Sequence, residues 1–139
     1  MILLDTHVLV WAVTGDTAKL PQQSLDNIDR AIMRGEAAVS AATFWELEVK
    51  RRKPRGNLPE LPPIKDLRSG VIRRGLAEVP VTGSLWVDAV SLIDDSFHQD
   101  PADQLIAATA IHLDCDLYTL DDKMLAWARE TGRVKLSKI

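Results

Sequence analysis

The 139-residue sequence contains a single cysteine, Cys115, and only 5% aromatic residues. One thiol excludes an internal disulfide and a multi-cysteine zinc site, and it is typical of chains kept in a reducing compartment. The longest early apolar run, residues 8–13, is too short to cross a bilayer, and no basic leader with a small-residue cleavage site precedes it. We therefore expect a soluble, cytoplasmic protein without a membrane partner, with Cys115 in its core.

Several familiar catalytic motifs are also missing from the sequence. There is no GxGxxG dinucleotide fingerprint, no phosphate-binding P-loop, no GxSxG nucleophile elbow and no Ser-His-Asp order. Acyl transfer and nucleotide-cofactor chemistry therefore have no support. The composition, 46% hydrophobic and 27% charged, is that of an ordinary globular chain at the length of one domain. We expect residues 1–139 to form a single domain.

Charge is distributed unevenly along the chain, although the formal net charge is only −3. Residues 1–49 carry −4, residues 50–75 carry +7 and residues 76–139 carry −6. A basic block between two acidic segments favours a phosphate-attracting surface beside a group of carboxylates, while a solvated helix end is the alternative interpretation. The candidates for phosphate contacts are Lys50, Arg51, Arg52, Lys53 and Arg55.

Short apolar runs alternate with segments of helical periodicity throughout the chain. The expected strands are residues 2–4, 37–39, 78–81, 116–119 and 134–136. The expected helices are residues 24–33, 41–52, 64–76, 84–93, 101–113 and 122–130. Prolines concentrated in residues 54–63 indicate a surface loop. The alternation predicts an α/β fold, a three-layer α/β/α sandwich around a central, mostly parallel sheet, with its ligand site beyond the carboxyl ends of the strands.

Aspartates fall at the positions where such a fold brings its strand ends together. Asp5 directly follows the first strand, and Asp121 follows the strand that ends near residue 119. Asp100 and Asp103 begin the helix of residues 101–113. Each has a structural alternative, because aspartate is a preferred helix cap and is favourable in a first helical turn.

Glu46 is harder to explain as a structural residue. On a helical wheel it shares a face with Ala42, Thr43 and Val49, so it points inward from the middle of a helix, where an unpaired charge is costly. An ion pair with Lys50, one turn later, is the competing interpretation. Carboxylates crowded at one sheet edge repel each other, and a hard divalent cation resolves that conflict. Mg²⁺ or Mn²⁺ held in this way suits phosphodiester hydrolysis.

Four segments together carry a recognisable pattern: ILLDTHVLVW (residues 2–11), VSAATFWELEVK (39–50), HQDPADQLIAATA (98–110) and LYTLD (117–121). In this order and spacing they resemble the motifs of PIN-domain ribonucleases, specifically those of the VapC-type toxins. The resemblance spans nearly the whole chain. It implies a PIN-like fold and a divalent-metal-dependent endoribonuclease that cuts RNA, is usually a homodimer, and is held inactive by a small cognate antitoxin protein.

The resemblance also assigns roles by position. Asp100 matches an additional acid of this subgroup, and Thr6 matches a residue that supports the first aspartate. The chain departs from the subgroup at Gln104, where an arginine usually follows the third acid; this affects a phosphate or carboxylate contact from that position and not the metal site. The family's acidic quartet, which holds one or two Mg²⁺ or Mn²⁺ ions, corresponds to Asp5, Glu46, Asp103 and Asp121.

Two other functions remain open from the sequence. A metal-dependent phosphoesterase acting on small phosphate esters uses a strand-end aspartate as nucleophile, but His7 occupies the third position of its usual Asp-x-Asp arrangement. A non-enzymatic module with a vestigial site, binding nucleic acid or an antitoxin, is compatible with Gln104. Whether all four acids chelate a divalent ion distinguishes these alternatives.

The histidines and tryptophans favour structural roles. None of His7, His98 and His112 shows metal-ligand spacing, although His98 lies only two residues before Asp100. The tryptophans are expected in the core or in subunit contacts and not as platforms for stacked bases. They are Trp11, Trp45, Trp86 and Trp127.

Overall fold

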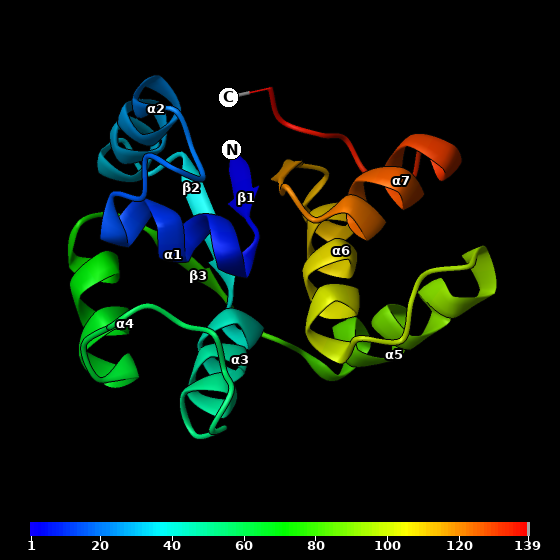
Figure 1. Ribbon diagram of the computed structural model, residues 1–139. Coiled ribbons are helices and arrows are strands. Elements are labelled where there is room, and N and C mark those ends of the chain that lie inside the picture. Colours follow the sequence, from blue (N-terminus) through cyan, green and yellow to red (C-terminus); the bar gives the residue numbers. More distant parts are fainter. Residues whose placement is uncertain (139) are drawn as a thin grey trace.

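The computed structural model describes residues 1–138, which form an α/β fold with one sheet of four parallel strands (Figure 1). The strand order is β3-β2-β1-β4, and Leu3 in β1 is paired with Ala38 on one side and Leu117 on the other. Because all neighbours are parallel, the carboxyl ends of the strands lie along one edge of the sheet. The strands are β1 (Ile2–Leu4), β2 (Ala37–Ser40), β3 (Ala77–Val79) and β4 (Asp116–Tyr118).

Helices cover both faces of this sheet. In Figure 1, α1, α2 and α4 lie on one side of the strands and α5, α6 and α7 on the other, with α3 below the strand ends. The predicted three-layer α/β/α arrangement is confirmed. The helices are α1 (Thr6–Thr14), α2 (Gln22–Met33), α3 (Ala41–Arg51), α4 (Ile64–Arg73), α5 (Gly83–Ser91), the 3₁₀ helix η1 (Leu92–Asp95), α6 (Pro101–Leu113) and α7 (Asp122–Thr131).

The sheet separates two apolar cores, and β1 contributes to both. Leu3 packs with residues of α5, α6 and α7, whereas Leu4 packs with residues of α1, α2 and α4. Consecutive strand residues point to opposite faces, so a short and entirely apolar strand is what a sheet covered on both sides requires. Cys115 belongs to the core on the α6 side, as expected. Among the described residues, no helix is long and apolar enough to span a membrane.

Most of the expected strands and helices lie within about two residues of the observed bounds, α1 is missing from the expected helices, and two elements differ more. The strand predicted at residues 134–136 is wrong, because Leu136 forms only an isolated parallel bridge with Leu117. The helix predicted at residues 64–76 ends at Arg73, since Gly75 adopts a φ of 116° and a side chain there would collide with the carbonyl oxygen of Ile32. The close approach of the α4 end to α2 therefore requires glycine and stops the helix early.

Candidate active site

The five predicted acids meet at the carboxyl edge of the sheet. Asp5 ends β1, Glu46 lies on α3 after β2, Asp100 and Asp103 begin α6, and Asp121 precedes α7 after β4. They line one pocket with a volume of about 250 Å³. The structure thus brings together every acidic residue proposed from the sequence. The remaining lining residues are His7, Lys50, His98 and Lys123.

Three of these aspartates are also helix caps. Asp5 accepts a hydrogen bond from the Thr6 backbone N–H at 2.7 Å, and Asp100 accepts one from the Asp103 N–H at 3.1 Å. Asp121 caps α7 in the same way, with 2.9 Å to the N–H of its third residue. The structural interpretation of these acids is therefore correct, and it does not compete with the functional one. Each of these bonds uses the Oδ1 atom of its aspartate. The N-termini of α1, α6 and α7, with the positive ends of their dipoles, therefore lie at one pocket.

Thr119 hydrogen-bonds to both Asp5 and Asp121, the first and last of these capping residues. It was not identified from the sequence. Its hydroxyl donates to Asp5 Oδ2 at 2.7 Å and accepts from the Asp121 backbone N–H at 3.0 Å. Its position two residues before Asp121, at the end of a strand, was the available signal. The predicted supporting residue Thr6 lies 3.2 Å, between hydroxyl oxygens, from Thr43 and donates its backbone N–H to Asp5.

Glu46 lines the pocket with a buried side chain that is only 10% exposed. Its Oε2 lies 3.1 Å from Lys50 Nζ, so the ion pair considered from the sequence is present. Its Oε1 is buried and has no hydrogen-bond partner among residues 1–138. A buried carboxylate oxygen without a partner costs free energy, so this atom calls for a cation or a proton donor in the pocket.

The pKa values of Asp103 and Asp5 are both raised by the site. Burial, together with the nearby charges of Asp5, Asp100, Glu46 and Asp121, raises the pKa of Asp103 from an ordinary 3.8 to about 8. Burial also raises the pKa of Asp5, against the lowering effect of its bonds from Thr119 and Thr6. Without a cation, the pocket thus favours keeping a proton on Asp103.

Two compact sets of donor atoms share Asp103. One consists of Glu46, Asp100 and Asp103, and the other of His98, Asp103 and Asp121, with the donor atoms of each set within 4.8 Å of one another. Asp5 belongs to neither set, although it lines the same pocket. Hard oxygen donors, a raised carboxyl pKa and an unpartnered carboxylate oxygen together fit a divalent cation such as Mg²⁺ or Mn²⁺.

The basic block begins inside the site. Lys50 lines the acidic pocket and also a second hollow of about 360 Å³ beside the loop that follows α3. Arg51 and Lys53 line that second hollow as well. The loop folds closely back on the end of α3, because Gly56 packs against the Lys50 carbonyl and leaves no room for a Cβ. Lys50 therefore connects the two hollows.

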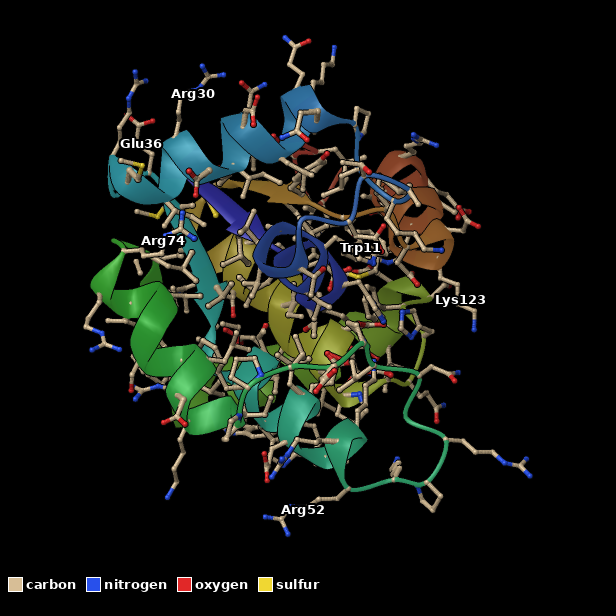
Figure 2. All side chains as sticks on the ribbon, turned by 60° about the vertical axis from the view of Figure 1, so that its left-hand side comes forward. Trp11, Arg30, Glu36, Arg52, Arg74 and Lys123 are labelled. Atoms are coloured by element: carbon tan, nitrogen blue, oxygen red, sulfur yellow. The ribbon has the colours of Figure 1, made fainter. Side chains whose placement is uncertain are left out.

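The other cations of the block lie further from the acids. Arg51 and Arg52 pair with Glu48 at 3.5 and 2.9 Å. Arg52, with a side chain 75% exposed, projects from the end of α3 away from the protein (Figure 2). Arg55 is exposed on the loop. Lys123, at the start of α7, was not singled out from the sequence although it lines the pocket.

Gln104 occupies the position at which the subgroup usually has arginine. Its side-chain amide does not face the acids. Its side chain is buried and its Nε2 donates to the backbone carbonyl of His98 at 3.0 Å. Of the tryptophans, Trp127 is in the core as expected, while Trp45 and Trp86 are about half exposed. Trp11 is partly buried against the core on the α1 side, so Trp45 and Trp86 are the more exposed of the four.

The fold and this arrangement of acids define a class of nuclease-like domains, and comparison with known proteins identifies it. A model of the PIN domain matches residues 2–130. The chain therefore belongs to the PIN-domain family, which confirms the resemblance of the four sequence segments.

Individual relatives agree with this family. The chain is 32% identical over 123 residues to ribonuclease VapC22 of Mycobacterium tuberculosis (strain ATCC 25618 / H37Rv), covering 88% of each protein. It superposes with a TM-score of 0.63 on a crystal structure of VapBC2 from Rickettsia felis bound to a promoter DNA fragment, at 17% identity and covering 99% and 98% of the two chains. FitAB bound to the IR36 DNA fragment gives a TM-score of 0.61, also at 17% identity, covering 99% and 94%. These two solved structures support the fold.

Proposed function

We propose that this protein is a divalent-metal-dependent endoribonuclease toxin that hydrolyses phosphodiester bonds in RNA and is neutralised by a cognate antitoxin. The observation that carries the proposal is the convergence of five carboxylates on one pocket, with a buried oxygen of Glu46 left without a partner among the described residues. The relationship to a ribonuclease at 32% identity supports RNA as the substrate.

In this proposal Mg²⁺ or Mn²⁺ is held by the acidic quartet, with Asp100 as an additional acid. Asp103 takes the central place, since it belongs to both compact donor sets. Asp5 has both oxygens hydrogen-bonded, but each oxygen keeps a second lone pair, so it acts directly or through a water. The quartet is Asp5, Glu46, Asp103 and Asp121.

The bound cation supplies Lewis acidity, which favours ionisation of an attacking water and stabilises negative charge on the phosphate. The chain's own groups prepare the site for this chemistry. Thr6 and Thr119 fix the Asp5 carboxylate through both oxygens, and Lys50 offers an ammonium donor beside Glu46 for a phosphate oxygen. Hydrolysis then joins the oxygen of water to phosphorus and breaks the bond to the leaving ribose oxygen.

The RNA backbone is proposed to run from the acidic pocket past Lys50 into the hollow beside the loop after α3. Lys53 and Arg51 line that hollow and supply charge for phosphates. Such contacts position the strand without selecting a base sequence. Arg52 and Arg55 extend the same positive surface outward.

The partners follow from the relatives. VapBC2 and FitAB are two of the solved structures that share this fold, and we propose that this chain binds a small antitoxin protein in the cytoplasm. We also propose a homodimer, as the resemblance to VapC-type toxins implies. Light scattering of the purified chain, alone and with its antitoxin, measures both assemblies.

The experiment that tests the function is cleavage of a mixed RNA pool by protein freed of any co-purifying partner, with Mn²⁺ or Mg²⁺ against EDTA. We expect fragments only with metal, and none from the Asp5→Asn variant. Cleavage by a correctly metallated Asp5→Asn protein would refute the role of Asp5. Hydrolysis of p-nitrophenyl phosphate without RNA cleavage would favour the phosphoesterase instead, and absence of metal binding would favour the non-enzymatic module.

A further inference from the structure

His98 is held at the rim of the acidic pocket by three separate contacts. Its ring stacks on Phe97 with 4.6 Å between centroids and 21° between planes, and Phe97 in turn packs edge-on against Trp127. Its Nδ1 accepts the Asp100 backbone N–H at 3.3 Å. Its carbonyl oxygen accepts the amide of Gln104 at 3.0 Å. Both the ring and the main chain of His98 are therefore fixed.

These contacts determine which nitrogen carries the proton. Because Nδ1 accepts a hydrogen bond, it presents a lone pair, and a neutral imidazole then has its proton on Nε2. Nε2 is buried and lies 3.2 Å from Asp103 Oδ2, without the alignment of a hydrogen bond. Among the described residues it has no hydrogen-bond partner. A buried donor is thus held beside the carboxylate that both donor sets share.

This arrangement is the reverse of a metal-binding histidine. A ligating imidazole presents a lone pair to the metal and donates its other N–H to a nearby acceptor. Here the outer nitrogen Nδ1 is an acceptor and the inner nitrogen Nε2 is the donor. Although Nε2 lies within 4.8 Å of Asp103 and Asp121 oxygens, its chemistry suits a hydrogen bond to a carboxylate.

We propose that His98 is a positioning residue whose Nε2–H, held 3.2 Å from Asp103 Oδ2, donates a hydrogen bond to that carboxylate when the cation is bound and so fixes it, with Gln104 holding His98 in place. The inference rests on the proposed function, since it names a residue that prepares its metal site. It also gives Gln104 a purpose: an amide at this position reaches the His98 carbonyl and stays neutral inside a buried helix turn. Outer-sphere partners of this kind are worth about 10–100-fold in metal affinity.

Two variants of His98 separate hydrogen-bond donation from packing. His98→Gln keeps an N–H donor at a similar reach, whereas His98→Phe keeps an aromatic ring on Phe97 and removes the donor. Mn²⁺ affinity of the full chain is measured by calorimetry without RNA, and thermal unfolding in EDTA checks the fold of each variant. We expect His98→Phe to weaken Mn²⁺ binding about 10–100-fold and His98→Gln to remain within a few-fold of the wild type.

Gln104→Met is the second variant, for the case that His98→Phe does not fold. It removes the donor to the His98 carbonyl at similar volume, and we expect a smaller loss of Mn²⁺ affinity in the same direction. Pulsed EPR of the wild type with Mn²⁺ gives an independent readout, in which we expect no directly bound nitrogen.

The outcomes separate this inference from the proposed function. If the wild type cleaves RNA and binds Mn²⁺, and folded His98→Phe binds Mn²⁺ with the same affinity, the role of His98 is overturned and the proposed function is not. A directly coordinated nitrogen in the EPR spectrum also overturns it, since His98 would then be a ligand. Wild-type protein that binds no Mn²⁺ contradicts the proposed function and this inference together.

Discussion

Replacing Asp103 with asparagine should stabilise the metal-free protein while removing its response to metal. At 4.8 Å, the outer limit within each donor set, two like unit charges repel by about 0.9 kcal/mol in bulk water and about 3.5 kcal/mol at an effective dielectric of 20. The Asp103→Asn substitution keeps the size of the side chain and removes this repulsion. We expect the variant to gain about 1–3 kcal/mol at pH 8 in EDTA.

The pH dependence of stability gives a second test of the direction of this effect. Because the folded-state pKa of Asp103 is raised to about 8 from an ordinary value of 3.8, the native state binds the proton more tightly than the unfolded chain. The stabilisation that this proton gives to the folded state is complete below about pH 4 and is lost as the pH rises through about 8. The wild type should therefore lose stability relative to Asp103→Asn between pH 5 and pH 8.

Urea unfolding at pH 5 and pH 8, in EDTA and with Mn²⁺, measures this prediction. For a chain of this length each kcal/mol corresponds to about 3 °C in Tm, so a thermal scan also resolves it. Mn²⁺ should raise the stability of the wild type and not that of the variant. A variant that is less stable than the wild type at pH 8 in EDTA would refute the reasoning that the acids repel one another around Asp103.

Three further substitutions test other parts of the site. Thr119→Val removes the hydroxyl that serves Asp5 and Asp121 and should cost about 1–3 kcal/mol in urea unfolding, while Thr119→Ser should stay near the wild type. Glu46→Gln should lower Mn²⁺ affinity in calorimetry by at least tenfold while leaving the fold intact, so unchanged affinity contradicts its role as a ligand. Replacing Lys53 and Arg55 with alanine should reduce the salt dependence of RNA binding by about 0.7 in log-log slope per lost phosphate contact; Arg52→Ala, whose guanidinium is paired with Glu48, should change it less.

The positions of the acids were predictable because they depend on local rules. A short apolar strand ending in aspartate, and the order Asp-Pro-x-Asp before an apolar helix, each place a carboxylate at a helix start. Parallel strands then bring those helix starts to one edge. The inward orientation of Glu46 followed from helical periodicity in the same way.

The connections between these residues were not predictable from local patterns. Thr119 reaches Asp5 across 114 positions of sequence, and nothing around a strand-end threonine specifies which strand lies beside it. The buried amide of Gln104 turns back to a carbonyl six residues earlier, which depends on the shape of the turn before α6. The strand expected at residues 134–136 also depends on a distant neighbour, since only Leu136 forms a bridge, to Leu117 of β4.

The distribution of hydrogen bonds contributes to the raised pKa of Asp103. Asp5, Asp100 and Asp121 each cap a helix, and each carboxylate accepts a hydrogen bond from a backbone N–H. Asp103 lies in the first turn of α6 and caps nothing, and among the described residues no backbone N–H donates to its carboxylate. Burial and the charges of the neighbouring acids therefore raise the pKa of Asp103 to about 8 with no opposing backbone hydrogen bond from the described residues. A cation that enters the pocket must displace the proton on Asp103, so metal binding should release a proton and strengthen as the pH rises toward 8.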